Sequence, residues 1–106
     1  METPLEVDVT TAAQMMREGA LLIDVREPAE LAICSIPGSR HIPMREIPAA
    51  VAGLPADQPL LVICHVGVRS RHVTTFLRAN GRRDVSNVAG GIDAWAGQID
   101  PLLARY

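Results

Sequence analysis

The chain has 106 residues, enough for one domain with a modest core, and its net charge of −2 gives no reason to expect nucleic acid or an anionic membrane as a partner. Apolar residues make up 48% of the sequence and aromatic residues only 3%, so we expect a core of aliphatic side chains. Two cysteines are too few for a disulfide scaffold, and no apolar run approaches the roughly 20 residues that a membrane-spanning helix needs.

The beginning of the chain predicts a strand followed by a helix. Apolar and polar residues alternate over residues 5–9, which is typical of a half-buried strand. Thr10 or Thr11 is expected to cap the helix, because Thr11 and Gln14 have the spacing of a capping box. Gly19 is well placed to end this helix.

The next segment predicts a second strand and two further helices. Residues 21–25 form a nearly continuous apolar run, typical of a buried strand, with Asp24 close to its carboxyl end. A buried carboxylate needs a partner, which makes this aspartate conspicuous. We expect a short helix over residues 28–33 and a brief strand over residues 40–42. Another helix is expected to start between Pro43 and Pro48 and to run to about Val51.

Residues 60–70 are the most informative stretch. Residues 60–63 are four aliphatic side chains, typical of a strand that is buried on both faces, and Cys64 follows directly. A short loop containing Gly67 then leads into a segment with helical spacing. Backbone N–H groups in such a loop and the positive end of the helix dipole favour the thiolate. We therefore expect Cys64 to be a nucleophile rather than an inert buried thiol.

The remaining elements continue the alternation of strands and helices. Val73, Phe76 and Leu77 have the spacing of a buried helix face. Residues 85–88 predict a last short strand, and residues 90–95 predict a tight Gly-Gly turn into a helix. This order predicts a parallel α/β sheet with helices on both faces, and a site beyond the carboxyl ends of the strands.

Four stretches of the sequence resemble the single-domain rhodanese-like sulfurtransferases, in the order typical of that family. They are LIDVREPAEL (residues 22–31), IPGSRHIP (36–43), ICHVGVRS (63–70) and NVAGGIDAW (87–95). The resemblance implies a single rhodanese-like domain over residues 1–106, with a three-layer α/β/α fold and a five-stranded parallel sheet. It also implies a persulfide carried on the loop cysteine. The tail over residues 98–106 lacks the family's usual Gly-x-Pro ending.

Sulfur transfer from thiosulfate or a persulfide donor needs a thiolate and a place for anions. Cys64 is the expected catalytic residue, and Arg69 is expected to pair with Asp24 or Glu27 and so to organise the loop. The expected anion-binding loop consists of His65, Val66, Gly67, Val68, Arg69 and Ser70. The expected loop-supporting residues are Asp24, Arg26 and Glu27. This chemistry requires neither a metal nor an organic cofactor.

The sequence allows more than one role for several side chains near the expected site. Arg26 either faces the site or clamps a neighbouring loop, and His65 either tunes the choice of substrate or is simply solvated. Cys34 is expected to be an inert or partly buried thiol, with a resolving role as the less favoured alternative. Trp95 is expected to anchor the core.

Two other functions share these motifs. Four residues separate Cys64 from Arg69, whereas cysteine phosphatases resemble one another in having five, so a phosphatase is disfavoured. A sulfur-relay or interaction module, which exchanges persulfide with protein partners and has little thiosulfate activity, stays open. The expected partners are a small-molecule sulfur donor and a thiophilic acceptor, with a protein sulfur acceptor as the alternative. Since the first residues do not resemble a signal peptide, we expect a cytoplasmic protein.

Overall fold

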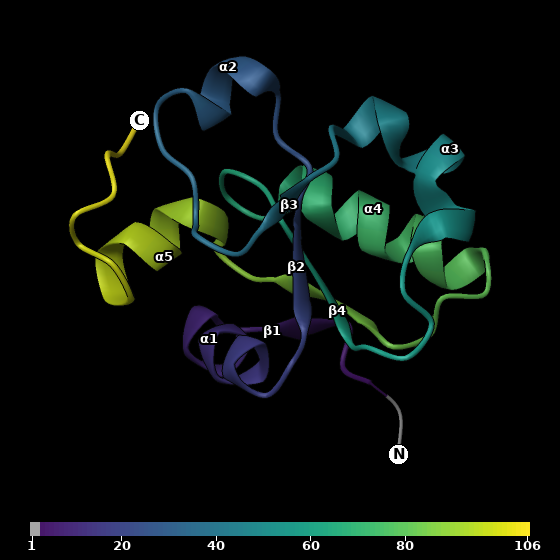
Figure 1. The fold of residues 1–106 in the computed structure, drawn as a ribbon. Coiled ribbons are helices and arrows are strands. Elements are labelled where there is room, and N and C mark those ends of the chain that lie inside the picture. Colours follow the sequence, from purple (N-terminus) through teal and green to yellow (C-terminus); the bar gives the residue numbers. More distant parts are fainter. Residues whose placement is uncertain (1–2) are drawn as a thin grey trace.

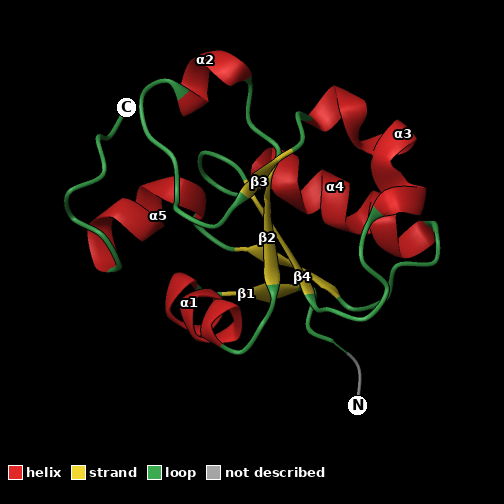
Figure 2. Cartoon of the chain, in the orientation of Figure 1, coloured by secondary structure: helices red, strands yellow, loops and turns green. Residues whose placement is uncertain are grey.

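The computed structural model describes residues 3–106 and contains a five-stranded sheet in the order β1-β5-β4-β2-β3, with every neighbouring pair of strands parallel (Figure 1 and Figure 2). The strands are β1 (Glu6–Val7), β2 (Leu21–Asp24), β3 (Arg40–His41), β4 (Leu60–Ile63) and β5 (Val85–Val88). The helices are α1 (Val9–Arg17), α2 (Pro28–Leu31), α3 (Ile47–Ala50), α4 (Val68–Ala79) and α5 (Gly91–Gln98), with 3-10 turns η1 (Met44–Glu46) and η2 (Val51–Gly53) on either side of α3. None of the helices in residues 3–106 has both the length and the apolar character needed to cross a membrane.

Helices cover both faces of the sheet and form the outer layers of the fold (Figure 1). One core cluster joins α1 and α5 to the sheet and includes Val9, Ile92 and Trp95. A second cluster joins α3 and α4 to the opposite face and includes Ile47 and Leu77. The three-layer α/β/α fold that the sequence predicted is therefore confirmed, and Trp95 is a core residue as expected.

The central strand β4 lies between β2 and β5, and all four of its residues are buried. Leu61 and Ile63 belong to the cluster under α1 and α5, and the other two residues belong to the cluster under α3 and α4, because successive side chains of a strand point to opposite faces. Asp24, at the end of β2, is in register with Ile63. The sheet thus places Asp24 and Cys64 at neighbouring strand ends.

The start of α1 differs from the prediction. The helix begins at Val9 and is capped by Asp8, whose carboxylate accepts a 2.8 Å hydrogen bond from the Thr11 N–H and has its pKa lowered by it. The expectation of a Thr10 or Thr11 cap is therefore wrong. An aspartate at this position satisfies the third N–H of the helix, and the earlier start makes Val9 a helical residue that is buried in the core.

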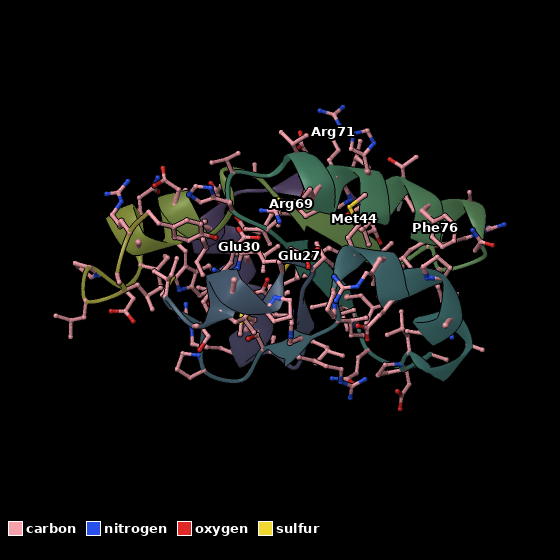
Figure 3. The ribbon with its side chains drawn as sticks, turned by 90° about the horizontal axis from the view of Figure 1, so that it is seen from above. Glu27, Glu30, Met44, Arg69, Arg71 and Phe76 are labelled. Carbon is pink, nitrogen blue, oxygen red and sulfur yellow. The ribbon has the colours of Figure 1, made fainter. Side chains whose placement is uncertain are left out.

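Phe76 also differs from the prediction. It is 38% exposed, whereas Val73 and Leu77 on the same helix are buried. The helix predicted to start between Pro43 and Pro48 and to run to about Val51 is in fact three short segments, η1, α3 and η2. These segments leave an open groove along α4. The groove is lined by Met44, Ile47, Pro48, His72, Val73 and Phe76; Figure 3 labels the two side chains at its rim, Met44 and Phe76.

Candidate active site

Cys64 directly follows β4, and its sulfur lies inside a loop of polar groups. The backbone N–H groups of Gly67 and Ser70 donate to Sγ at 3.2 and 3.3 Å, and the Ser70 hydroxyl oxygen lies 3.2 Å from it. The residue is only 1% exposed, so these contacts are made away from bulk water. N–H donors stabilise negative charge on sulfur, so this arrangement can hold an anionic sulfur atom.

Gly67 gives the loop its tight turn. Its φ of 105° lies in the left-handed region that other residues rarely adopt, and α4 begins at the next residue. Ser70 is the third residue of α4, so its N–H has no partner within the helix and is free to donate to Sγ. The Asn87 side chain holds the other side of the turn, since Nδ2 donates to the Gly67 carbonyl at 3.1 Å. Glycine at this position therefore allows both N–H groups to converge on the sulfur.

The first turn of α5 packs against the backbone of Cys64 and His65. The Ile92 N–H donates to the Cys64 carbonyl at 2.8 Å, and the Asp93 N–H donates to the His65 carbonyl at 3.0 Å. Gly91 lies next to both carbonyls with a φ of 59°, and a Cβ at this residue would collide with both carbonyl oxygens. The position of the loop after Cys64 thus depends on a glycine in a different element.

Replacing Gly91 with alanine should destabilise the fold by about 2–3 kcal/mol, because the new methyl group adds both backbone strain and overpacking. Urea unfolding measures the loss as a lower midpoint. Gly53→Ala is the matched control. Within residues 3–106 a methyl group at Gly53 would meet no heavy atom of a non-neighbouring residue within 4 Å, and the Gly53 backbone is not left-handed. Equal midpoints for the two variants would contradict the close approach of α5 to the loop.

Arg69 forms a bidentate ion pair with Glu30, with nitrogen–oxygen distances of 2.6 and 2.9 Å; Figure 3 shows the two side chains facing each other. The expectation that Arg69 pairs with Asp24 or Glu27 is therefore wrong. Asp24 binds a buried arginine, and Glu27 binds a different arginine on the surface. The reason is the orientation of α2, which turns Glu30 rather than Glu27 toward the loop.

Arg26 is completely buried and joins β2 to the segment around α2. Its guanidinium pairs with Asp24 at 2.8 Å and donates to the carbonyls of Cys34 and Glu30 at 2.8 and 3.3 Å. Cys34 is partly buried, and its sulfur lies 3.8 Å from Arg26 Nη1. The structure therefore shows Arg26 in the second of its two expected roles, holding a neighbouring loop.

Two residues of this cluster, Glu30 and Tyr106, were missed in the sequence. The Tyr106 hydroxyl donates to Glu30 Oε2 at 2.7 Å and accepts from Arg26 Nη1 at 3.0 Å. Its ring stacks on His65, with centroids 4.0 Å apart and planes 10° apart. Glu30 lies within the LIDVREPAEL stretch and could have been found there, whereas Tyr106 lies in a tail that matches no motif.

The ion pairs of this cluster shift the pKa values of their members toward the charged forms. Hydrogen bonds from Arg69 lower the pKa of Glu30 to about 2, although burial opposes this, and Glu30 in turn raises the pKa of Arg69. Burial raises the pKa of Tyr106 to about 12. Burial also opposes the charge of Arg26, but hydrogen bonds to Asp24 and Tyr106 outweigh it and raise the pKa of this arginine. At neutral pH the Arg69–Glu30 pair is thus fully charged and the tyrosine is neutral.

The low pKa of Glu30 makes the pair sensitive to acid. A carboxyl group with a pKa of about 2 in the folded chain and an ordinary value of 4.5 contributes stability that is fully present above pH 4.5 and is lost as the pH falls through 2. Glu30→Gln should therefore be less stable than the unchanged protein by about 2 kcal/mol near neutral pH, after allowance for the partial exposure of Arg69. Urea unfolding curves of the two proteins should converge at about pH 2. A difference that stays constant down to that pH would contradict the assignment.

The other loop residues differ in their surroundings. His65 is held by the tail, because its Nε2 lies 2.9 Å from the Tyr106 carbonyl oxygen in addition to the ring stack. Val66 and Val68 are 52% and 61% exposed and flank the loop on its outer side. Within residues 3–106, no three His, Cys, Asp or Glu side chains come together in a group that could hold a metal ion.

Comparison with known proteins agrees with this geometry. Residues 8–98 match the family described as "Rhodanese-like domain". A sulfurtransferase of Allochromatium vinosum is 36% identical, over 93% of this chain and 94% of its own length. The thiosulfate sulfurtransferase GlpE of Pseudomonas fluorescens is 37% identical, over 78% of this chain and 77% of its own. The chain also matches the larger chloroplastic Rhodanese-like/PpiC domain-containing protein 12 of Arabidopsis thaliana at 38% identity, but spans only 30% of that protein.

Solved structures show the same fold. A rhodanese-like domain protein of Staphylococcus aureus has a TM-score of 0.78 and 32% identity, over 87% of this chain and 91% of its own. The human single-domain sulfurtransferase TSTD1 has a TM-score of 0.82 and 25% identity, over 90% of this chain and 97% of its own. The matches cover most of this chain and include the cysteine loop that follows β4. The chain therefore belongs to the rhodanese-like domain family, among relatives named as sulfurtransferases.

Proposed function

We propose that the protein is a rhodanese-type sulfurtransferase that moves sulfane sulfur from thiosulfate or a persulfide donor to a thiophilic acceptor through a persulfide on Cys64. The observation that supports this most directly is the convergence of the Gly67 and Ser70 N–H groups on Sγ. Two free cysteines, Cys34 and Cys64, fit a reducing cytoplasm as the proposed location.

The first half-reaction loads the cysteine. The Cys64 thiolate attacks the outer sulfur of thiosulfate, a new sulfur–sulfur bond forms, and the original one breaks so that sulfite leaves with the electron pair. Donors that hold the thiolate also suit the persulfide anion, because both carry their charge on sulfur. The N–H groups of Val68 and Arg69, in the first turn of α4, lack intrahelical partners by geometry and are available for the outer sulfur or the donor anion.

Arg69 supplies positive charge near the loop. Its bidentate contact with Glu30 fixes the guanidinium in one place, and its raised pKa keeps it cationic. A fixed cation beside the attack site lowers the free energy of bringing a dianion such as thiosulfate to an anionic sulfur. We assign Arg69 to positioning the loop and to attracting the donor anion.

The second half-reaction empties the cysteine. A thiophilic acceptor, for example cyanide, attacks the outer sulfur of the persulfide, and the bond to Sγ breaks with the electron pair returning to Cys64 as thiolate. With cyanide the product is thiocyanate. The two steps form a covalent ping-pong cycle in which donor and acceptor bind in turn.

A persulfide relay between proteins is the second candidate. The exposed apolar side chains of Val66 and Val68 beside the loop favour it, because a protein partner that delivers or accepts sulfur must cover this surface. A very high KM for thiosulfate together with rapid loading by a persulfidated protein would favour the relay. A low KM for thiosulfate would favour the small-molecule reaction.

Intact mass spectrometry tests the proposed function. Incubation with thiosulfate should add the mass of one sulfur atom to the protein, and a reductant should remove it. Peptide mapping should place the added sulfur on Cys64, and the Cys34→Ser variant should gain it equally well. Absence of the adduct with thiosulfate and with a low-molecular-weight persulfide would overturn the proposal, and hydrolysis of an aryl phosphate would replace it with a phosphatase.

A further inference from the structure

The tail that follows α5 returns to the carboxyl edge of the sheet and ends beside α2 (Figure 1). Its residue Tyr106 contacts two segments that are far from it in the sequence, one running from β2 into α2 and one directly after β4. The hydroxyl contacts Glu30 of α2 and Arg26 after β2, and the ring covers His65 of the catalytic loop. None of these contacts is used by the sulfur chemistry described above.

We propose that Tyr106 is a positioning residue for sulfur transfer: it holds Glu30 in the orientation that fixes Arg69 beside the Cys64 loop. This inference rests on the proposed function, because it assigns Tyr106 a role in binding the anionic sulfur donor. Tyr106 transfers no proton in this role; its protonated hydroxyl donates to Glu30, and its ring stacks on His65.

The contacts of Glu30 are the first argument. Each of its carboxylate oxygens binds one nitrogen of Arg69 and one further anchor. Oε1 accepts from Arg69 Nη1 at 2.6 Å and from the Glu27 N–H at 3.1 Å. Oε2 accepts from Arg69 Nη2 at 2.9 Å and from the Tyr106 hydroxyl at 2.7 Å. Tyr106 is thus one of the two supports that keep the carboxylate from rotating about its side-chain bonds.

The second argument is that Tyr106 is itself held from the protein interior. Its hydroxyl accepts from Arg26, which is completely buried and bound to the equally buried Asp24. An unbroken chain of hydrogen bonds therefore runs from Asp24 through Arg26, Tyr106 and Glu30 to Arg69. Arg69 is 35% exposed along its side chain, so its position depends on this chain more than on surrounding packing.

The third argument is the contact with His65, the residue after Cys64. The Tyr106 ring lies flat on the imidazole, and the Tyr106 carbonyl oxygen lies 2.9 Å from Nε2. Tyr106 thus contacts the loop directly at His65 and indirectly, through Glu30, at Arg69. Removing only the hydroxyl separates these two effects, because the stack stays in place.

The experiment compares Tyr106→Phe with Leu102→Ala, a control in the same tail whose side chain is 95% exposed. Loss of the hydroxyl should raise KM for thiosulfate about three- to tenfold, while kcat changes by less than about twofold. Leu102→Ala should leave both constants unchanged. A residue with a merely structural role would lower thermal stability without moving KM.

A double-mutant cycle shows whether the effect passes through Arg69. In an Arg69→Ala background, Tyr106→Phe should have no further effect on KM, because the group that it positions is gone. Tyr106 is the chain's one tyrosine, so phenolate absorbance reports on it alone. It should titrate at about pH 12, and at a lower pH in Glu30→Gln, because the Glu30 carboxylate contributes to raising its pKa.

The outcomes separate the two proposals. If the unchanged protein acquires sulfur from no donor, both the proposed sulfurtransferase function and the positioning role of Tyr106 are wrong. If the unchanged protein acquires sulfur but Tyr106→Phe has the same KM, or still raises KM without Arg69, only the positioning role is overturned. An equal pKa of Tyr106 in Glu30→Gln and in the unchanged protein would overturn it as well, since the contact with Glu30 would then be absent in solution.

Discussion

Replacing Cys64 with serine should abolish sulfur transfer and leave the fold intact. The hydroxyl is a far weaker nucleophile than a thiolate and cannot form a persulfide, so turnover of thiosulfate with cyanide should fall by on the order of a thousandfold or more. Serine is close to cysteine in size, and its oxygen can accept the N–H groups of Gly67 and Ser70 that now bind Sγ. Thiocyanate release measures the loss, and thermal unfolding checks the fold.

Cys34→Ser is the matched control for this prediction. Cys34 is partly buried, packs against the core cluster under α1 and α5, and has a long 3.8 Å contact between its Sγ and Arg26 Nη1. The hydrogen bond from Arg26 to the backbone carbonyl of Cys34 does not depend on the Cys34 side chain. Turnover of Cys34→Ser should therefore stay within about twofold of the unchanged protein. Residual turnover in Cys64→Ser, or loss of turnover in Cys34→Ser, would move the nucleophile away from position 64.

The features that were predicted correctly are each indicated by residues that lie close together in the sequence. β4 is four aliphatic residues in a row, and such a run has a low free energy only when both faces of the strand are covered. Cys64 follows the strand directly and Gly67 follows three residues later, which is enough to predict a strand end, a tight turn and a helix start. Knowledge of the rest of the chain is not needed for these features.

The features that the sequence did not predict depend on long-range geometry. Arg69 is 39 residues from Glu30, and Tyr106 is 76 residues from it. Glu27 and Glu30 are only three residues apart, and which of them meets Arg69 depends on the orientation of the short helix α2 and its N-cap. Phe76 has the spacing of a buried residue, but its exposure depends on segments opposite α4.

Replacing Asp24 with alanine should destabilise the protein by about 3–5 kcal/mol, because it leaves the buried Arg26 cation without its carboxylate partner. Urea unfolding near neutral pH measures the loss. Arg45→Ala is the control, because its ion pair with Glu27 joins side chains that are 59% and 52% exposed. Solvent screens such a pair, so this variant should lose at most about 1 kcal/mol.

A paired replacement tests whether the unpaired cation causes the loss. Asp24→Leu combined with Arg26→Met removes both charges and keeps apolar volume, so it should be more stable than Asp24→Ala. Because Arg26 also binds the Tyr106 hydroxyl, the paired variant should keep its fold but show a higher KM for thiosulfate, as Tyr106→Phe does. A loss for Asp24→Ala no larger than that for Arg45→Ala would mean that water reaches Arg26, and that the chain of hydrogen bonds from Asp24 to Arg69 is not anchored in the core.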